Sequence, residues 1–262
     1  MLKMKVLLLH KGFNFSQDGP GNRLVYHLQG CNFRCPWCSN PESMAAGGTL
    51  MTVQKSFNDT EKVKKLSCTE VEADELIYEA VRSSPMYFDG GGVTLTGGEP
   101  TVQFSAVRYL LEGFMQNKIH TAMETNGCHD RLPELFSLID FLIIDLKHYD
   151  SEKHSQVICH DNLITQENIK RALCERKQLL VRIPLINGFN ASNNDALKFV
   201  EFFKRLKTDS CSFELLRYHE YGKDKWAQCG LKYTVENANV SDEDYRFYIK
   251  AFVDNGLRLI RT

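Results

Sequence analysis

Three cysteines in the segment GCNFRCPWC are the residues of this sequence that point most directly to chemistry. Cys31, Cys35 and Cys38 follow the spacing C-x3-C-x2-C, which lets three thiolates converge on one small metal centre. A cubane iron–sulfur cluster with every iron bound by protein takes four cysteines, and no fourth follows nearby. A cluster held by three would keep one iron open to another ligand. Such an open position distinguishes catalytic metal sites from closed structural ones.

A structural zinc site is the alternative on spacing alone. Three cysteines and one histidine also bind zinc, and His27 lies just upstream of the triplet. Against zinc, C-x3-C is a less usual zinc spacing than C-x2-C. The other cysteines stand singly and are expected to be small buried hydrophobic residues, so we predict one metal centre. They are Cys68, Cys128, Cys159, Cys174, Cys211 and Cys229.

Length and composition exclude several classes of protein. The chain has 262 residues and 43% hydrophobic content, which suits one full-sized core. A net charge of −1 argues against a dedicated nucleic-acid binder. No stretch approaches the roughly 20 apolar residues of a membrane span, and the N-terminal VLLL is too short for a signal peptide. We expect a soluble cytoplasmic protein whose cysteines are metal ligands and reduced thiols.

Apolar runs of strand length alternate with amphipathic helical segments along the chain. Several runs are apolar nearly throughout, as are parallel strands buried on both faces. Repeated strand–helix units imply right-handed crossovers and a parallel sheet. Six strands, fewer than the eight of a closed barrel, predict an α/β fold with an open, partial (β/α) barrel. The predicted strands are 24–29, 92–97, 120–125, 140–146, 179–186 and 212–219.

The segment of about 41–70 differs in texture from the rest. It is polar, contains glycine and lacks sustained periodicity, so we interpret it as a surface insert with a small hairpin. Cys68 is its one cysteine, which predicts no second metal centre there. The chain is otherwise expected to form a single domain over 1–262.

A glycine-rich turn follows the second predicted strand. Gly97, Gly98 and Glu99 in GGGVTLTGGEP would present bare backbone and one carboxylate at the sheet edge. Glycine permits close approach of backbone to a ligand, and a carboxylate can pair with an ammonium group. A tight strand–helix connection is the simpler alternative for the same residues. In α/β sheets and barrels, however, ligands bind at this carboxyl edge.

Charged residues also stand at the ends of the next two strands. Asp145 and Lys147 are two apart in IIDLKH and therefore lie on the same face of a strand. Burying a charged group at the end of an apolar run costs free energy unless the group is paired or binds a ligand. These two residues therefore either contact a ligand or form a structural ion pair with each other. Glu124 and Asn126 in METNG follow the same logic.

The last two strands each add one further candidate. Arg182 interrupts the apolar strand LLVRIPLI, where a guanidinium would suit a carboxylate ligand or a core salt bridge. His219 ends the sixth strand, where it is either a ligand contact or a structural histidine. Together these residues surround one edge of the sheet, beside the cysteine loop.

With these motifs in view, the chain resembles the radical S-adenosylmethionine (SAM) superfamily, and within it the glycyl-radical-enzyme activating enzymes. C-x3-C-x-aromatic-C marks the superfamily. DGPG and YHEYGKDKW mark the activating-enzyme branch. The resemblance covers nearly the whole chain and is carried by the segments DGPGNRLVYHLQGCNFRCPWCSNPES, GGGVTLTGGEP, TAMETNG, FLIIDLKH, LLVRIPLINGFN and RYHEYGKDKW.

The resemblance implies a role for each matching residue. Cys31, Cys35 and Cys38 would hold one [4Fe-4S] cluster whose open iron chelates the methionine amine and carboxylate of SAM. Glu124 and Asp145 would bind a monovalent cation. Asp18 and Arg23 of DGPGNR would meet the substrate protein. The residues implied to contact SAM are Trp37, Cys38, Ser39, Gly97, Gly98, Glu99, Asp145, Leu146 through its backbone, Lys147, Arg182 and His219.

The activity implied is the activation of a partner enzyme. An electron from the cluster would cleave SAM to a 5′-deoxyadenosyl radical, which would abstract a Cα hydrogen from a glycine of a glycyl radical enzyme. A flavodoxin or ferredoxin would donate the electron in anaerobic metabolism. No nucleic acid or membrane is an expected partner.

Two other functions compete with this reading. A radical SAM enzyme acting on a small molecule, such as a deazapurine ring-contracting synthase, would share the cluster motif and GGEP but has no reason for DGPG or YHEYGKDKW. A zinc-stabilised α/β binding module would account for the cysteines alone.

Overall fold

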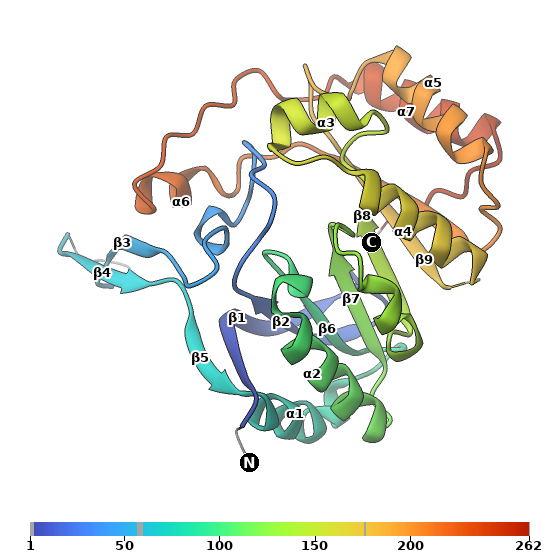
Figure 1. Cartoon of the computed structure of the whole chain (residues 1–262). Helices are drawn as coiled ribbons and strands as arrows, with labels where there is room; N and C mark the ends of the chain where they lie inside the picture. The colour runs from blue at the N-terminus through green and yellow to red at the C-terminus, as the bar shows by residue number, and fades with distance from the viewer. Residues whose placement is uncertain (1–2, 57–59, 176, 262) are drawn as a thin grey trace.

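A computed structural model describes residues 3–56, 60–175 and 177–261. Six strands run parallel within one eight-stranded sheet, in the spatial order β2-β6-β7-β8-β9-β10 (Figure 1). All six predicted strands are confirmed, with bounds that differ from the predicted ones by two residues at most. They are β2 (Asn22–Leu28), β6 (Gly92–Gly97), β7 (Thr121–Thr125), β8 (Phe141–Asp145), β9 (Leu179–Leu185) and β10 (Cys211–Arg217).

Two antiparallel strands extend this sheet and were not predicted. Strand β1 (Lys5–Phe15) pairs with β2, and β5 (Thr69–Glu72) pairs with the first part of β1. Only the first half of β1 carries buried apolar residues, so the sequence pattern there is short. Among the described residues no pairing joins the two ends of the sheet, β5 and β10, so the barrel is open as predicted.

Helices follow the parallel strands and cover the outside of the sheet (Figure 1). Their inward stripes enter the main core, as the buried Phe104, Val107, Leu111 and Phe114 of α2 illustrate. Val81 of α1 lies outside this core, because it is 38% exposed near the helix end. The helices are α1 (Ala73–Arg82), α2 (Phe104–Gln116), α3 (Ser151–Ile158), α4 (Leu163–Cys174), α5 (Asn193–Lys204), α6 (Lys223–Gln228) and α7 (Asp242–Asp254). Four 3-10 segments are η1 (Pro41–Ser43), η2 (Ser84–Met86), η3 (Pro100–Gln103) and η4 (Leu132–Leu138).

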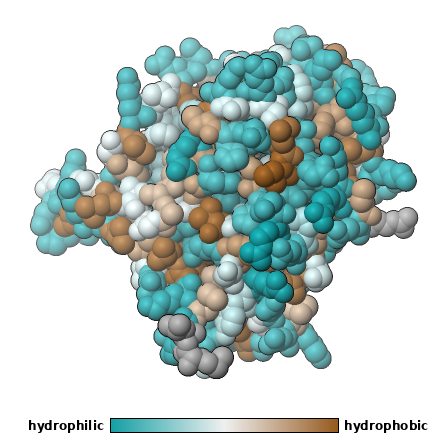
Figure 2. Space-filling view, in the orientation of Figure 1, coloured by the Kyte–Doolittle hydropathy of each residue, from teal (hydrophilic) through white to brown (hydrophobic). Residues whose placement is uncertain are grey.

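The insert forms the predicted hairpin, from β3 (Leu50–Gln54) and β4 (Lys62–Leu66). It projects from the body of the molecule on the left of Figure 1, and apolar side chains show on its surface in Figure 2. Cys68 is buried at its base, where its thiol lies near the carbonyl of Gly47. No helix in the described part of the chain is long and apolar enough to cross a bilayer.

Candidate active site

A cavity of about 660 Å³ lies at the carboxyl edge of the parallel strands. This volume falls within the range of about 300–1,000 Å³ usual for small-molecule sites. Most residues singled out from the sequence line it: Asp18, Cys31, Cys35, Trp37, Cys38, Ser39, Gly97, Gly98, Glu124, Asn126, Asp145, Lys147 and His219. Four of the predicted residues are not on its wall, namely Arg23, Glu99, Leu146 and Arg182.

The three cysteines lie on a loop between β2 and η1, residues 29–40, which we call the cluster loop. The amide of Phe33 donates to the sulfur of Cys31, and that of Asn40 donates to the sulfur of Cys38, each at 3.4 Å. Burial raises the pKa of all three thiols to about 12. A cationic metal centre would therefore be needed to hold them as thiolates.

The donor set fits an iron–sulfur cluster. Three soft thiol ligands share one cavity wall, and backbone N–H groups already point at two of the sulfurs, as hydrogen bonds to cluster sulfurs require. Within the described residues, no three His, Cys, Asp or Glu side chains are grouped so that they could hold a single metal ion. His27 also lines the cavity, and its buried Nδ1 has no hydrogen-bond partner in the described part of the chain.

The two glycines of GGEP hold the start of the cluster loop. The amide of Gly98 donates to Leu28 at 2.9 Å, and that of Glu99 donates to Gly30 at 2.7 Å. A Cβ on Gly97 would lie 2.2 Å from the Leu28 nitrogen, and one on Gly98 would lie 2.2 Å from the Gly30 oxygen. Only glycine permits this approach, so these residues position the loop as well as line the cavity.

The Glu99 carboxylate, which the resemblance assigns to an ammonium group, is not exposed on the cavity wall. It is fully buried and accepts hydrogen bonds from the amide and hydroxyl of Thr101, the hydroxyl of Thr125 and the amide of Asn126. Asn126 in turn donates to Asn32 of the cluster loop at 2.7 Å. Glu99 thus braces the strand ends under the loop.

Asp145 and Lys147 form an ion pair on the cavity wall, 2.8 Å between Oδ2 and Nζ. Burial of Lys147 opposes its charge, but the Asp145 carboxylate and the nearby sulfurs of Cys35 and Cys31 raise its pKa above the ordinary value. Lys147 therefore stays protonated beside the cysteines. The intervening Leu146 is buried, and its amide donates to the Arg182 carbonyl at 2.9 Å.

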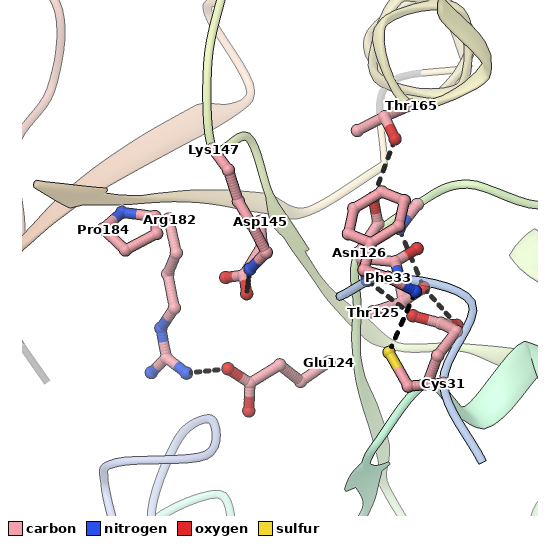
Figure 3. Close-up of polar contacts among 12 residues, drawn as sticks. Cys31, Phe33, Glu124, Thr125, Asn126, Asp145, Lys147, Thr165, Arg182 and Pro184 are labelled. Carbon is pink, nitrogen blue, oxygen red and sulfur yellow. Dashed lines mark hydrogen bonds and ion pairs between the residues drawn. The ribbon is translucent and has the colours of Figure 1, made fainter. Parts of the chain in front are cut away.

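Arg182 lies behind the wall and joins several strands. Its guanidinium donates to Glu124 at 2.7 Å and to Glu214 at 2.8 Å, and also to the carbonyl of Gln17. Figure 3 shows the guanidinium directed toward Glu124, with Asp145 and Lys147 above the pair. Of the two alternatives that the sequence left open for Arg182, the core salt bridge is the arrangement observed.

Burial raises the pKa of Glu124 to about 7. Arg182 opposes this rise, whereas the neighbouring carboxylates of Asp145 and Asp18 add to it.

Arg23 is fully buried, which corrects its predicted contact with a substrate protein. Its guanidinium donates to the Thr94 hydroxyl at 2.7 Å and to the Pro20 carbonyl at 3.0 Å. Burial lowers the pKa of Arg23 to about 10. The residue fixes the DGPG turn from within, and this turn brings Asp18 to the cavity wall.

The segment that follows His219, residues 220–226, covers the cluster loop, and no role was assigned to it from the sequence. The Trp226 indole donates to the Cys38 carbonyl at 2.9 Å, and Lys225 pairs with Glu42 at 2.7 Å. Gly222 packs so closely that an added Cβ would lie 2.4 Å from the Ser39 Cα. The signal was present in the motif YHEYGKDKW, but only the fold reveals its contact with the loop.

Near the cavity rim, His219 stacks on the exposed Tyr221, with 4.2 Å between ring centroids. Burial lowers the pKa of His219 below its ordinary value. Trp37 packs against Phe189 at 5.1 Å. Aromatic and imidazole groups thus frame the mouth, as suits a planar, partly apolar ligand.

Comparison with known proteins agrees with this arrangement. Residues 25–202 match the Radical SAM superfamily. Pyruvate formate-lyase-activating enzyme of Staphylococcus aureus (strain USA300) is 33% identical over 238 residues, which cover 87% of this chain and 86% of that protein. The chain therefore belongs to the radical SAM superfamily and, within it, to the family of pyruvate formate-lyase-activating enzymes.

Solved structures show the same fold. A domain of pyruvate-formate lyase-activating enzyme from Bacteroides vulgatus ATCC 8482 matches 65% of this chain and 98% of its own length, with a TM-score of 0.53 and 28% identity. Streptococcus suis SuiB matches 90% of this chain and 48% of its own, with a TM-score of 0.61 and 15% identity. The protein is a radical SAM enzyme, and membership implies a [4Fe-4S] cluster and SAM.

We expect Trp226→Phe to weaken SAM binding roughly fivefold, because the Cys38 carbonyl loses a hydrogen bond of about 1 kcal/mol. Equilibrium binding of SAM to the anaerobically reconstituted protein measures the change. Lys223→Ala is the matched control in the same helix, since Lys223 is exposed and its ion pair is with the exposed Glu220. Equal SAM affinity for Trp226→Phe and the wild type would contradict a positioning role for this segment.

His154 under the cluster loop predicts a pH dependence of stability. It is 1% exposed, packs on Phe33, and burial lowers its pKa to about 4. Between pH 6.5 and 4 the unfolded chain binds a proton that the folded protein does not, so stability falls as the pH falls. Relative to His154→Gln, the free energy of unfolding of cluster-free wild type should drop by about 2 kcal/mol from pH 7.5 to 5. Urea unfolding at both pH values measures this change, and an equal change in unfolding free energy for the wild type and His154→Gln would contradict the prediction.

Proposed function

We propose that this protein is a glycyl-radical-enzyme activating enzyme. The observation that carries the proposal is one cavity that combines the three thiols of the cluster loop with Asp18 of the DGPG turn. The first set suits a metal centre, and the second lies on the turn that marks the activating-enzyme branch. The similarity to pyruvate formate-lyase-activating enzyme over most of the chain supports the same activity.

Cys31, Cys35 and Cys38 would hold the cluster, leaving one iron for SAM. When bound, the cluster and SAM supply the 5′-deoxyadenosyl radical that takes a Cα hydrogen from glycine. The protein orients them: Gly97 and Gly98 offer backbone for the ammonium, and Trp37, Ser39 and His219 border the adenosine. Lys147, kept protonated by Asp145, compensates the negative charge that thiolates bring to the wall.

The partner is a glycyl radical enzyme, and pyruvate formate-lyase is the first candidate because of the relatives' activity. A flavodoxin or ferredoxin is the proposed electron donor, in a cytoplasmic setting. The proposal includes the domain organisation: residues 1–262 form one domain. An insert at about 41–70 stands in place of a ferredoxin-like insert. A small-molecule radical SAM enzyme would leave Asp18 and the DGPG turn without a purpose.

Label transfer tests the proposal directly. Pyruvate formate-lyase containing Cα-deuterated glycine is mixed anaerobically with the reconstituted protein, SAM and a reductant. We expect a protein radical by electron paramagnetic resonance and deuterium in the 5′-deoxyadenosine, because the abstracted atom moves to that product. SAM cleavage without a radical or label in this partner or in other glycyl radical enzymes would refute the activity.

Cysteine variants test the metal centre. Cys35→Ala should abolish SAM cleavage and the reduced-cluster signal, whose g-values shift when SAM binds the wild type. Cys68→Ala is the matched control and should keep about four iron atoms per chain, because one cube is expected. Loss of iron in Cys68→Ala would mean that the insert binds metal. One zinc and no iron in the wild type would favour the binding module.

The monovalent cation is the remaining part of the proposal. Glu124 and Asp145 both line the cavity, and the crowding of carboxylates there would be relieved by a cation. We expect faster SAM cleavage in potassium chloride than in choline chloride at equal ionic strength. Glu124→Gln should reduce that difference. Equal rates in both salts for the wild type would contradict a cation requirement.

A further inference from the structure

The second half of β1 lies outside the core. Beyond an irregularity between Leu8 and His10, the strand pairs with β2 alone, and no described residue pairs with its other edge. The four residues from His10 to Phe13 are all exposed, and Phe15 is exposed as well. One edge of this stretch is therefore open, whereas on its outer face Lys11 pairs with Glu79 and Phe13 lies against Tyr87, with 6.4 Å between ring centroids. Such an edge offers unpaired backbone donors and acceptors to another chain.

Large apolar side chains are exposed around the end of β1: Phe13 and Phe15 lie on the strand, and Met86 and Phe88 lie in the segment whose backbone bonds to Asn22 of β2. Phe13, Phe15, Met86 and Phe88 are between 46% and 53% exposed, and we call them the β1 aromatic patch. Within this patch, Phe15 stacks on Phe88 with ring centroids 5.9 Å apart. Natural proteins usually blunt exposed edges with charge or proline, yet this one carries aromatic residues. Exposed apolar patches of this kind mark protein interaction sites.

Both ends of the open edge adjoin the cavity. At one end, His10 stacks on His27, which lines the cavity, with 3.7 Å between centroids. At the other, Phe15 directly precedes the turn that brings Gln17 and Asp18 to the cavity wall. Between the two ends, a Cβ placed on Gly12 would meet nothing within 4 Å. A chain laid along this edge would thus run beside the cavity mouth without obstruction.

We propose that the partner glycyl radical enzyme docks by adding an extended segment to the edge of β1 at residues 10–15, with apolar side chains of that segment on the β1 aromatic patch. The inference rests on the proposed function. Unpaired backbone selects an extended peptide over a lipid or small molecule. Lys11, the nearest cation on this face, already pairs with Glu79 at 2.6 Å, so the surface has little attraction for nucleic acid.

Phe15→Glu tests the docking surface. We expect its dissociation constant for pyruvate formate-lyase, measured anaerobically, to rise roughly tenfold or more, because a charge replaces an aromatic contact of the patch. Formation of 5′-deoxyadenosine without the partner should stay unchanged. Leu197→Glu on α5 is the matched control, since Leu197 is 52% exposed and Phe15 is 53% exposed. It should bind the partner as the wild type does.

Hydrogen–deuterium exchange on the wild type supplies a second test that needs no variant. Amides of residues 10–15 should gain protection when pyruvate formate-lyase is added. Unchanged exchange there, or unchanged affinity for Phe15→Glu while the wild type still forms the glycyl radical, would overturn this docking mode and leave the activity standing. A wild-type dimer that Phe15→Glu dissociates would assign the edge to a second copy instead. Wild type that cleaves SAM but neither binds nor radicalises any such partner would overturn the proposed function, and the docking mode with it.

Discussion

The shape of the site depends on a single buried guanidinium. Arg182 on β9 contacts Glu124 of β7, Glu214 of β10 and the backbone of Gln17, and so ties three strands to the turn that carries Asp18. Removing one partner of a buried ion pair typically costs about 3–5 kcal/mol, because the other charge is left uncompensated. The barrel is open, so the strands near the gap lack the mutual support of a closed ring. The arginine supplies cross-links there in place of closure.

The site also requires that the cluster loop keep a fixed conformation at the carboxyl edge of the sheet. Three separate parts of the chain meet this requirement: Gly98 and Glu99 fix the loop's beginning, Asn126 holds Asn32, and Trp226 holds its end. Each contact reaches loop backbone or an amide side chain and leaves the cysteine sulfurs facing the cavity. Thiols, which burial keeps neutral until a metal arrives, are therefore presented by a loop whose course is already set.

The sequence predicted the parallel strands and most of the cavity wall because both follow from local pattern. Buried parallel strands are apolar runs, and their carboxyl ends meet at one edge, so Asp145, Lys147 and His219 could be placed from order alone. The direction in which a single side chain points could not be predicted in this way. Glu99 and Arg23 turn inward because hydroxyls and carbonyls from distant segments are there to receive them. Strand β1 was missed because its outer half has no burial to create a pattern.

The same lack of burial in the second half of β1 makes this strand suitable for pairing with another chain. A strand of 11 residues whose second half is supported by one neighbour is poorly protected against pairing with other chains. A small-molecule enzyme gains nothing from such an edge, whereas an enzyme whose substrate is a loop of another protein needs a surface that recognises backbone near its cavity. Strand β1 lies next to the end of the open sheet, and the turn that follows it brings Asp18 to the cavity wall. The features that depart most from a closed, well-buried fold are thus the ones that a protein substrate requires.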